Sequence, residues 1–142
     1  MNRHPLGTAD YPLAEKRPDI VRGKRGKALD AITLEGVVSG DVTLDDLGIT
    51  KDALLQQAEI ARAAGRPTLA QNFERAAELV GVPQERIMQV YELLRPGRAK
   101  SKTELMAAAH EMRGTHGAVK MALFIEEAAA VYEQRGLFKT RY

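Results

Sequence analysis

Apolar residues recur at helical spacing throughout residues 66–98, with one break near the middle. The first apolar set is Phe73, Ala76, Ala77 and Val80, and the second set is Ile87, Val90, Tyr91 and Leu94. Within each set the positions fall at i, i+3, i+4 and i+7, which places them on one face of an α-helix. Gly81 suits a left-handed end to the first helix, and Pro83 suits the first turn of the second. The pattern therefore predicts a helical hairpin.

Shorter apolar patterns precede this hairpin, and each begins after a threonine that can cap a helix. Thr33 and Thr50 stand directly before such patterns, and Thr43 has Asp46 three residues later, the spacing of a capping box. The expected helices run through Val38 to a stop at Gly40, through a short turn to Gly48, and from Lys51 to Ala64, with Leu54, Ala58 and Ala61 on the inner face of the last.

Two further helices are predicted after the hairpin. Ser101 and Glu104 have capping-box spacing for a helix that runs through Arg113. The apolar face of this helix is Leu105, Ala108, Ala109 and Met112. Residues 114–117 include two glycines, each of which costs about 1 kcal/mol inside a helix, so a break is expected there. The last helix is expected over residues 118–134, and its apolar surface is broad enough to be covered on several sides.

The first 30 residues lack a helical period and contain several prolines and glycines, which predicts an extended arm. Tyr11, Pro12 and Leu13 give this arm one apolar anchor, which could lie against its own chain or against a partner. No segment combines the length and the alternation of a β-strand. The predicted fold is all-α, with the arm over residues 1–30 followed by one helical domain over residues 31–142, a compact bundle of about four to six helices.

Composition and charge favour a chain that binds a partner. Hydrophobic residues make up 44% of the chain, but aromatics only 5%, so the private core is modest and burial against another chain is favoured. Residues 1–27 carry seven bases against three acids, residues 28–50 carry five acids and no base, and residues 95–102 carry four bases. Such blocks can steer docking onto a surface of opposite charge. Solvated loops of mixed charge are the plain alternative.

Cysteine is absent, which excludes disulfides and thiolate metal sites. No apolar run approaches the length of a transmembrane helix, and Met1–Pro5 has no apolar signal region, so we expect no membrane partner and a cytoplasmic location.

No catalytic, cofactor-binding or metal-binding residue is predicted. His110 and His116 are six residues apart, which misses the i, i+4 spacing of two ligands on one helix face. Residues 23–27 resemble a phosphate-binding loop, but Val21 and Ala28 stand where that motif needs glycine and serine or threonine. The basic clusters have no neighbouring aromatics for base stacking, so nucleic acid is not an expected partner.

Two sequence strings carry a family resemblance. LAQNFERAAEL over residues 69–79 and VPQERIMQVYELLRP over residues 82–96 closely resemble the small (gamma) subunit of adenosylcobalamin-dependent diol and glycerol dehydratases. Shorter matches are Asp10-Tyr11-Pro12-Leu13-Ala14, Ala64-Gly65-Arg66, Glu127-Ala128-Ala129, Val131-Tyr132 and Arg135. The resemblance covers roughly residues 10 to 138 without a large gap.

The resemblance implies a non-catalytic subunit of a hydro-lyase complex that converts 1,2-propanediol to propanal and glycerol to 3-hydroxypropanal. It implies that a large subunit holds the substrate and that adenosylcobalamin lies between the large and medium subunits. The small subunit is expected to pack on the large one and stabilise it, in an assembly with two copies of each. Some relatives housed in bacterial microcompartments carry a long N-terminal extension. Only nine residues precede Asp10, so this location is not favoured here.

Arginine and tyrosine are enriched at interface hot spots, so the hairpin also offers candidate contacts. The guanidinium groups of its arginines lie partly off the apolar stripes, where they could meet carboxylates of a large subunit. They could instead form pairs within a helix, such as Glu92 with Arg95. The interface candidates are Tyr11, Pro12, Arg75, Arg86, Tyr91 and Arg95. The alternative hypothesis is a free-standing helical adaptor that binds an acidic protein or nucleic acid through its basic segments.

Overall fold

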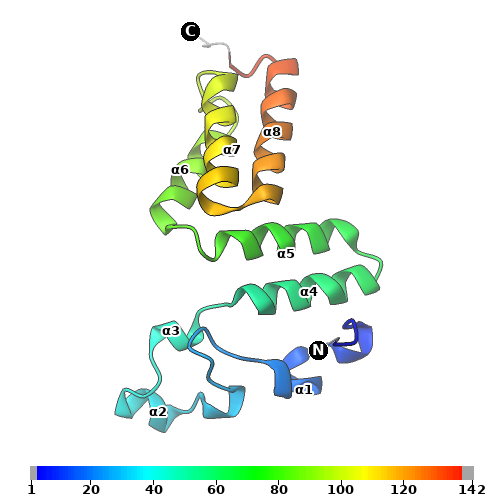
Figure 1. Cartoon of the computed structure of the whole chain (residues 1–142), viewed down its shortest axis with the longest axis vertical. Helices are drawn as coiled ribbons and strands as arrows, with labels where there is room; N and C mark the ends of the chain where they lie inside the picture. Colours follow the sequence, from blue (N-terminus) through cyan, green and yellow to red (C-terminus); the bar gives the residue numbers. More distant parts are fainter. Residues whose placement is uncertain (1–2, 139–142) are drawn as a thin grey trace. The chain divides into compact units, whose positions relative to one another are not determined.

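The computed structural model describes residues 3–138, and contacts within the chain divide it after Val80 into two compact units. Both units are helical, and no β-strand occurs between residues 3 and 138, so the predicted all-α class is confirmed (Figure 1). The first unit covers residues 1–80 and the second covers residues 81–142. The expected division into an arm over residues 1–30 and a helical domain over residues 31–142 stays a prediction. None of the described helices is both long and apolar enough to cross a membrane.

Helices α4 and α5 form the centre of the first unit and lie side by side (Figure 1). Their contact is made by small residues, because Ala58, Ala61 and Ala70 are buried between them and let the two backbones approach closely. Leu69 and Phe73 pack against this alanine cluster. The elements of the unit are the 3₁₀ turns η1 (Thr8–Asp10), η2 (Pro18–Ile20) and η3 (Leu29–Ala31) and the helices α1 (Leu13–Lys16), α2 (Leu34–Ser39), α3 (Leu44–Leu47), α4 (Lys51–Ala63) and α5 (Pro67–Leu79).

The N-terminal arm lies against its own unit rather than free in solvent. Leu6 and Leu13 are buried in a cluster with Ile60 of α4. Glu59 of the same helix accepts a hydrogen bond from the Leu6 backbone N–H at 2.9 Å and pairs with Arg3 at 2.8 Å. The sequence analysis left open whether the arm covers its own chain or a partner, and these contacts favour its own chain. The arm is also less extended than predicted, since short helical turns fill much of it.

The second unit contains α6 (Gln84–Leu94), α7 (Lys102–His116) and α8 (Val119–Gln134). Helices α7 and α8 pack side by side, and α6 packs against α7 (Figure 1). Leu105 and Met112 of α7 and Ile125 of α8 are the largest fully buried side chains. The predicted apolar face of α7 is therefore confirmed. Tyr132 donates a hydrogen bond from its hydroxyl to the Leu94 carbonyl, which ties α8 to the end of α6.

The break expected after Arg113 lies one turn later. Helix α7 continues through Gly114 to His116, and Gly117 ends it in the left-handed conformation at φ +63°. The buried face of the helix offsets the cost of one internal glycine, because most helical stability in proteins comes from packing. The end at Gly117 is fixed by backbone geometry, since the Ala118 N–H returns to the Met112 carbonyl at 2.9 Å.

Both helices of the expected hairpin exist, as α5 and α6. The division between the two units falls between them, so their packing as a hairpin stays a prediction. Within the first unit, α5 packs against α4. The left-handed end expected at Gly81 is wrong, since Gly81 has no positive φ. Val80, which follows the last residue of α5, has a right-handed helical conformation. The small faces of α4 and α5 explain their pairing, since alanine on both sides allows a close approach.

Candidate interaction surface

Two short helices of the first unit leave their large apolar side chains in solvent. These residues are between 51% and 87% exposed and occur close together in the sequence. We call the set the α2–α3 apolar surface, and its members are Leu34, Val37, Val38, Leu44, Leu47 and Ile49. A folded chain rarely exposes so many large apolar residues in one segment unless another molecule covers them.

Helix α2 faces outward because its inner side is a glycine. The Thr33 hydroxyl caps the helix by accepting a hydrogen bond from the Gly36 N–H at 3.1 Å. The Gly36 carbonyl accepts one from the Val42 N–H at 2.9 Å, and Val42 is buried. A methyl group added at Gly36 would lie 2.7 Å from the Val42 side chain. The close contact with Val42 therefore occupies the glycine side of α2, and the larger residues remain outside.

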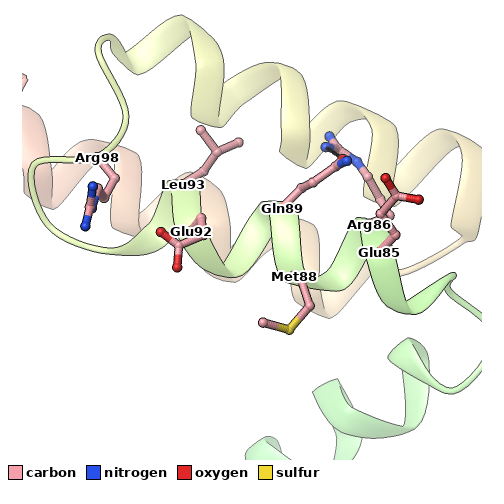
Figure 2. A pocket seen from close by; sticks show the side chains of 7 residues that line it. All are labelled: Glu85, Arg86, Met88, Gln89, Glu92, Leu93 and Arg98. Atoms are coloured by element: carbon pink, nitrogen blue, oxygen red, sulfur yellow. Dashed lines mark hydrogen bonds between the residues drawn. The ribbon is translucent and has the colours of Figure 1, made fainter.

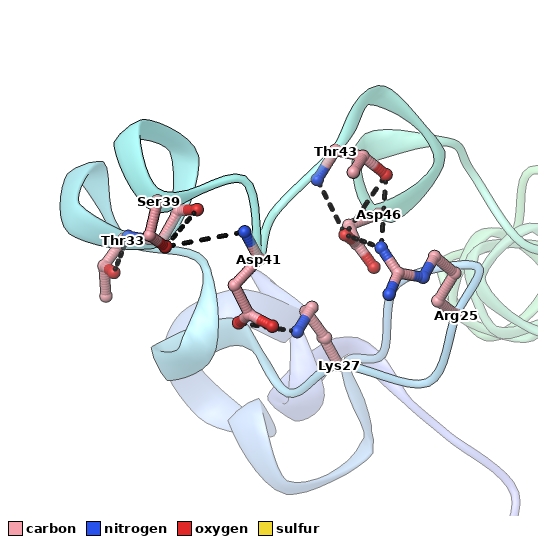
Figure 3. A network of polar contacts seen from close by, with 8 residues as sticks. Arg25, Lys27, Thr33, Ser39, Asp41, Thr43 and Asp46 are labelled. Atoms are coloured by element: carbon pink, nitrogen blue, oxygen red, sulfur yellow. Dashed lines mark hydrogen bonds and ion pairs between the residues drawn. The ribbon is translucent and has the colours of Figure 1, made fainter.

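Helix α3 is held by a buried carboxylate. Asp46 is 3% exposed, and its Oδ2 accepts hydrogen bonds from the Thr43 backbone N–H at 2.8 Å and from the Arg25 guanidinium at 3.1 Å (Figure 3). The predicted capping box of Thr43 and Asp46 is therefore confirmed. A buried carboxylate with charged and backbone donors fixes the helix in one orientation, because any rearrangement would leave the charge without partners.

The basic loop of residues 22–28 contacts α3 and the segment that joins α2 to α3. Gly23 lies directly against α3, so that a methyl group there would come within 2.4 Å of the Asp46 carbonyl oxygen. Lys27 pairs with Asp41 at 2.8 Å, and this hydrogen bond lowers the pKa of the Asp41 carboxyl (Figure 3). The loop that resembled a phosphate site thus uses Arg25 and Lys27 as structural partners of aspartates.

A second exposed region follows α6 in the second unit. A hollow of about 650 Å³ lies along this helix and is lined by Glu85, Arg86, Met88, Gln89, Glu92, Leu93 and Arg98 (Figure 2). Met88 and Leu93 provide its apolar part, and charged groups provide the rest. Tyr91, which was expected on the apolar face of the same helix, is 57% exposed and so is not part of the internal core.

Arg86 is engaged inside the second unit. Its Nε donates to Glu111 Oε1 at 2.9 Å and its Nη2 donates to Oε2 at 2.5 Å, which joins α6 to α7. These hydrogen bonds are the main reason why the pKa of the Glu111 carboxyl lies below its usual value. His116 Nε2 lies 3.7 Å from the same carboxylate. The Arg86 guanidinium, which could have met a carboxylate of a large subunit, therefore binds the Glu111 carboxylate of its own chain.

The other interface candidates lie at exposed or partly exposed positions. Arg95 pairs with Glu92 at 3.1 Å, and the Arg75 guanidinium donates to the Asn72 side chain. Tyr11 is 59% exposed, follows η1 and precedes the exposed Pro12 through a cis peptide bond. Tyr11 also lines a hollow of about 300 Å³ with Phe73 of α5. Whether any of these residues contacts a partner stays a prediction.

The α2–α3 apolar surface was missed by sequence reasoning. The helix caps at Thr33 and Thr43 were recognised, but no prediction was made about the direction in which the apolar residues after them face. The available signal was length: a helix of six residues and one of four are too short to bury their large apolar side chains and also pack on a core. Within residues 3–138 no group of three or more histidine or acidic side chains is placed to hold a metal ion.

Comparisons with known proteins give the chain its family. A family model described as "Dehydratase small subunit" matches residues 6–139. The propanediol dehydratase small subunit of Citrobacter freundii is 48% identical over 136 residues, which cover 96% of this chain and 78% of the relative. The propanediol dehydratase small subunit of Salmonella typhimurium is 47% identical over 131 residues, which cover 92% of this chain and 75% of the relative. The chain therefore belongs to the dehydratase small subunit family.

Proposed function

We propose that this chain is the non-catalytic small subunit of a complex that removes water from 1,2-propanediol to give propanal, with glycerol as a second substrate that gives 3-hydroxypropanal. The names of the two relatives support the propanediol assignment. The observation that carries the structural role is the α2–α3 apolar surface, because a set of large side chains presented to solvent by capped helices fits a subunit that is completed by a partner.

The partners in this proposal are a large catalytic subunit and a medium subunit, with two copies of each subunit in the assembly. The small subunit packs on the large one and stabilises it. The cytoplasmic location expected from the sequence stays a prediction.

Adenosylcobalamin is the cofactor of the proposed complex, where it supplies the radical that starts the elimination. The hollow along α6 does not fit it, because the Arg86 guanidinium that lines the hollow is already bound by Glu111 and no lining residue is a histidine that could approach cobalt. We therefore assign the cofactor to the large and medium subunits and derive no reaction step through this chain.

The alternative of a free-standing adaptor for acidic partners is weakened by the way the basic segments are used. Arg25 pairs with Asp46, Lys27 with Asp41 and Arg17 with Asp10 and Asp19. In the later basic segment, Arg95 pairs with Glu92 and Lys102 with Glu133. Cations that are already paired within the chain contribute less to a field that attracts nucleic acid.

The test is reconstitution. The large and medium subunits encoded with this chain are expressed with and without it, and dehydration of propanediol is assayed after addition of adenosylcobalamin. The proposal expects no turnover and no cobalamin-dependent change in the visible spectrum for the isolated chain, and a higher yield of soluble, active complex when all three chains are present. Tight cobalamin binding by the isolated chain would contradict the assignment, as would failure of the three chains to co-purify.

A further inference from the structure

We infer that a hollow in the first unit is a binding site for a small carboxylic acid with an aromatic body. The hollow has a volume of about 300 Å³, and we call it the arm hollow because the N-terminal arm forms one of its walls. Its lining includes Thr8 and Tyr11 from the arm, Gln57 and Ile60 from α4, and Leu69 and Phe73 from α5. The inference is independent of the proposed function, because every residue that carries it belongs to this chain.

Contacts within the first unit hold the walls of the arm hollow in place. Ile60 is buried in a cluster with Leu6 and Leu13 of the arm. The adjacent Glu59 accepts a hydrogen bond from the Leu6 backbone N–H at 2.9 Å and pairs with Arg3 at 2.8 Å. The arm is therefore fixed against α4 before a ligand arrives, and a site that is ordered in advance loses less conformational freedom on binding.

The apolar lining determines the body of the ligand. Leu69 and Phe73 pack against the alanine cluster between α4 and α5, and the exposed Tyr11 adds a second aromatic ring. An aromatic ligand gains favourable contacts with such rings in addition to the burial of its apolar surface. Small-molecule sites have volumes of about 300 to 1,000 Å³, so a hollow at the lower end of this range takes a small ligand.

The charge of the ligand follows from Arg66, which directly precedes α5 and lines the hollow. Within residues 3–138 its guanidinium has neither an ion pair nor a hydrogen bond with another group of the chain. None of the described residues that line the hollow is acidic. A guanidinium has five N–H donors and binds carboxylates through charge-assisted hydrogen bonds. An apolar hollow beside such a group therefore suits an anion.

Nearby acids do not neutralise Arg66, because each acid that adjoins a lining residue in the sequence is bound to another cation. The pairs are Asp10 with Arg17, Glu59 with Arg3, and Glu74 with Arg62. The lining also offers the Thr8 hydroxyl and the Gln57 amide as hydrogen-bonding groups. A molecule that carries a carboxylate on its own aromatic body satisfies both the hollow and the cation. One internal side chain of a protein partner supplies either an aromatic ring or a carboxylate, but not both.

The first experiment titrates the isotope-labelled full chain with phenylacetate and follows the amide chemical shifts. Saturable shifts should be confined to residues of the arm hollow, with a dissociation constant of about 1 mM or below, as expected of a ligand with few atoms. Phenylacetamide has the same ring without the charge and should bind about fivefold more weakly. Acetate lacks the ring and should give no saturable shifts at these residues. Equal affinity for phenylacetate and phenylacetamide would overturn the inference.

A second experiment removes the cation. Arg66→Gln should weaken phenylacetate binding about fivefold and leave phenylacetamide binding unchanged, because only the carboxylate uses the guanidinium. Arg66→Lys should retain part of the affinity, since it keeps the charge and loses the fork of donors. Arg98→Gln is the matched control, because it removes the same charge from an exposed residue that does not line the arm hollow. An equal loss with Arg98→Gln would contradict a local role of Arg66.

A third experiment fills the hollow. Ala64 lines it at an exposed position, so Ala64→Phe should keep the fold, as circular dichroism would verify, and abolish binding of both aromatic probes. Ala63→Phe adds the same ring at an exposed position outside the lining and should leave binding unchanged. Absence of saturable shifts with phenylacetate would overturn the inference, as would shifts that Ala64→Phe does not remove. If Ala64→Phe prevents co-purification with the other subunits while phenylacetate gives no shifts, the hollow takes a side chain of a partner instead.

Discussion

Arg86 of α6 and Glu111 of α7 face each other through two parallel hydrogen bonds, so that one guanidinium edge meets one carboxylate edge. The two residues are 25 positions apart and connect the two helices through their side chains. Such a two-pronged contact fixes orientation as well as distance. The pair therefore sets the position of the helix that carries Met88 and Tyr91 on its exposed side.

Arg86→Lys tests the importance of the fork. Lysine keeps the charge but cannot form two parallel hydrogen bonds, so the free energy of unfolding should fall by up to about 1 kcal/mol, the range of partly exposed ion pairs. Urea unfolding of Arg86→Lys, Glu111→Gln and the double variant gives the coupling energy of the pair. Strictly additive effects would mean that the contact contributes nothing to stability in solution.

Stability should depend on pH through the carboxylates of the second unit. Hydrogen bonds from Arg86 lower the pKa of Glu111, and those from Arg113 lower the pKa of Glu126, relative to the ordinary value of 4.5. The unfolded chain therefore binds more protons as the pH falls, so this stabilisation is present above pH 4.5 and is lost as the pH drops through the folded-state values. Thermal melting between pH 7 and pH 3 should show the loss. Glu126→Gln should melt with a shallower decline over the same window.

Two apolar truncations should separate the core from its edge. Leu105 is fully buried, and Leu105→Ala should lower the free energy of unfolding by about 2–5 kcal/mol. Phe73 is only partly buried at the edge of the alanine cluster, so Phe73→Ala should cost less than the roughly 3–5 kcal/mol typical of a fully buried ring. Urea unfolding checks both variants. A larger cost for Phe73→Ala than for Leu105→Ala would contradict the burial found here.

Arg95→Glu separates an interface role from a role within the helix. The pair with Glu92 has the i, i+3 geometry of a surface contact, so its loss should change the free energy of unfolding by only a few tenths of a kcal/mol. If Arg95 contacts the large subunit, as its place among the interface candidates predicts, recovery of the complex should still fall strongly at moderate salt. Recovery equal to wild type would leave the bond to Glu92 as the role of this arginine.

Most helices could be predicted from the sequence, because their caps and apolar faces depend on residues close together in the chain. The caps at Thr33 and Thr50, the capping box at Thr43 and the apolar face of α7 each depend on residues within a few positions, and each is present in the structure. The helix expected to end at Arg113 continues to His116, and the chain breaks at Gly117, the last residue of the expected break, because packing of α7 offsets the cost of Gly114 within the helix.

Long-range choices were not readable in the same way. The packing of α5 against α4 depends on how closely alanine faces approach in three dimensions, which spacing along the chain does not show. The same holds for Arg86, whose partner at Glu111 lies on another helix. The outward face of α2 follows from the contact between Gly36 and Val42, which spacing alone does not show.

The last prediction concerns the contact that holds the basic loop on α3. A methyl group at Gly23 would come within 2.4 Å of a backbone carbonyl, which cannot move aside as a flexible side chain would. Gly23→Ala should therefore lower the free energy of unfolding by about 1–3 kcal/mol, the range of overpacked sites. Gly81→Ala is the matched control, because nothing lies within 4 Å of the added group and no positive φ is required there. If Gly23→Ala also displaces Arg25 from Asp46, α3 should exchange its amide hydrogens faster while α7 keeps its protection. Equal stability and exchange in the two variants would mean that the loop does not support the α2–α3 apolar surface.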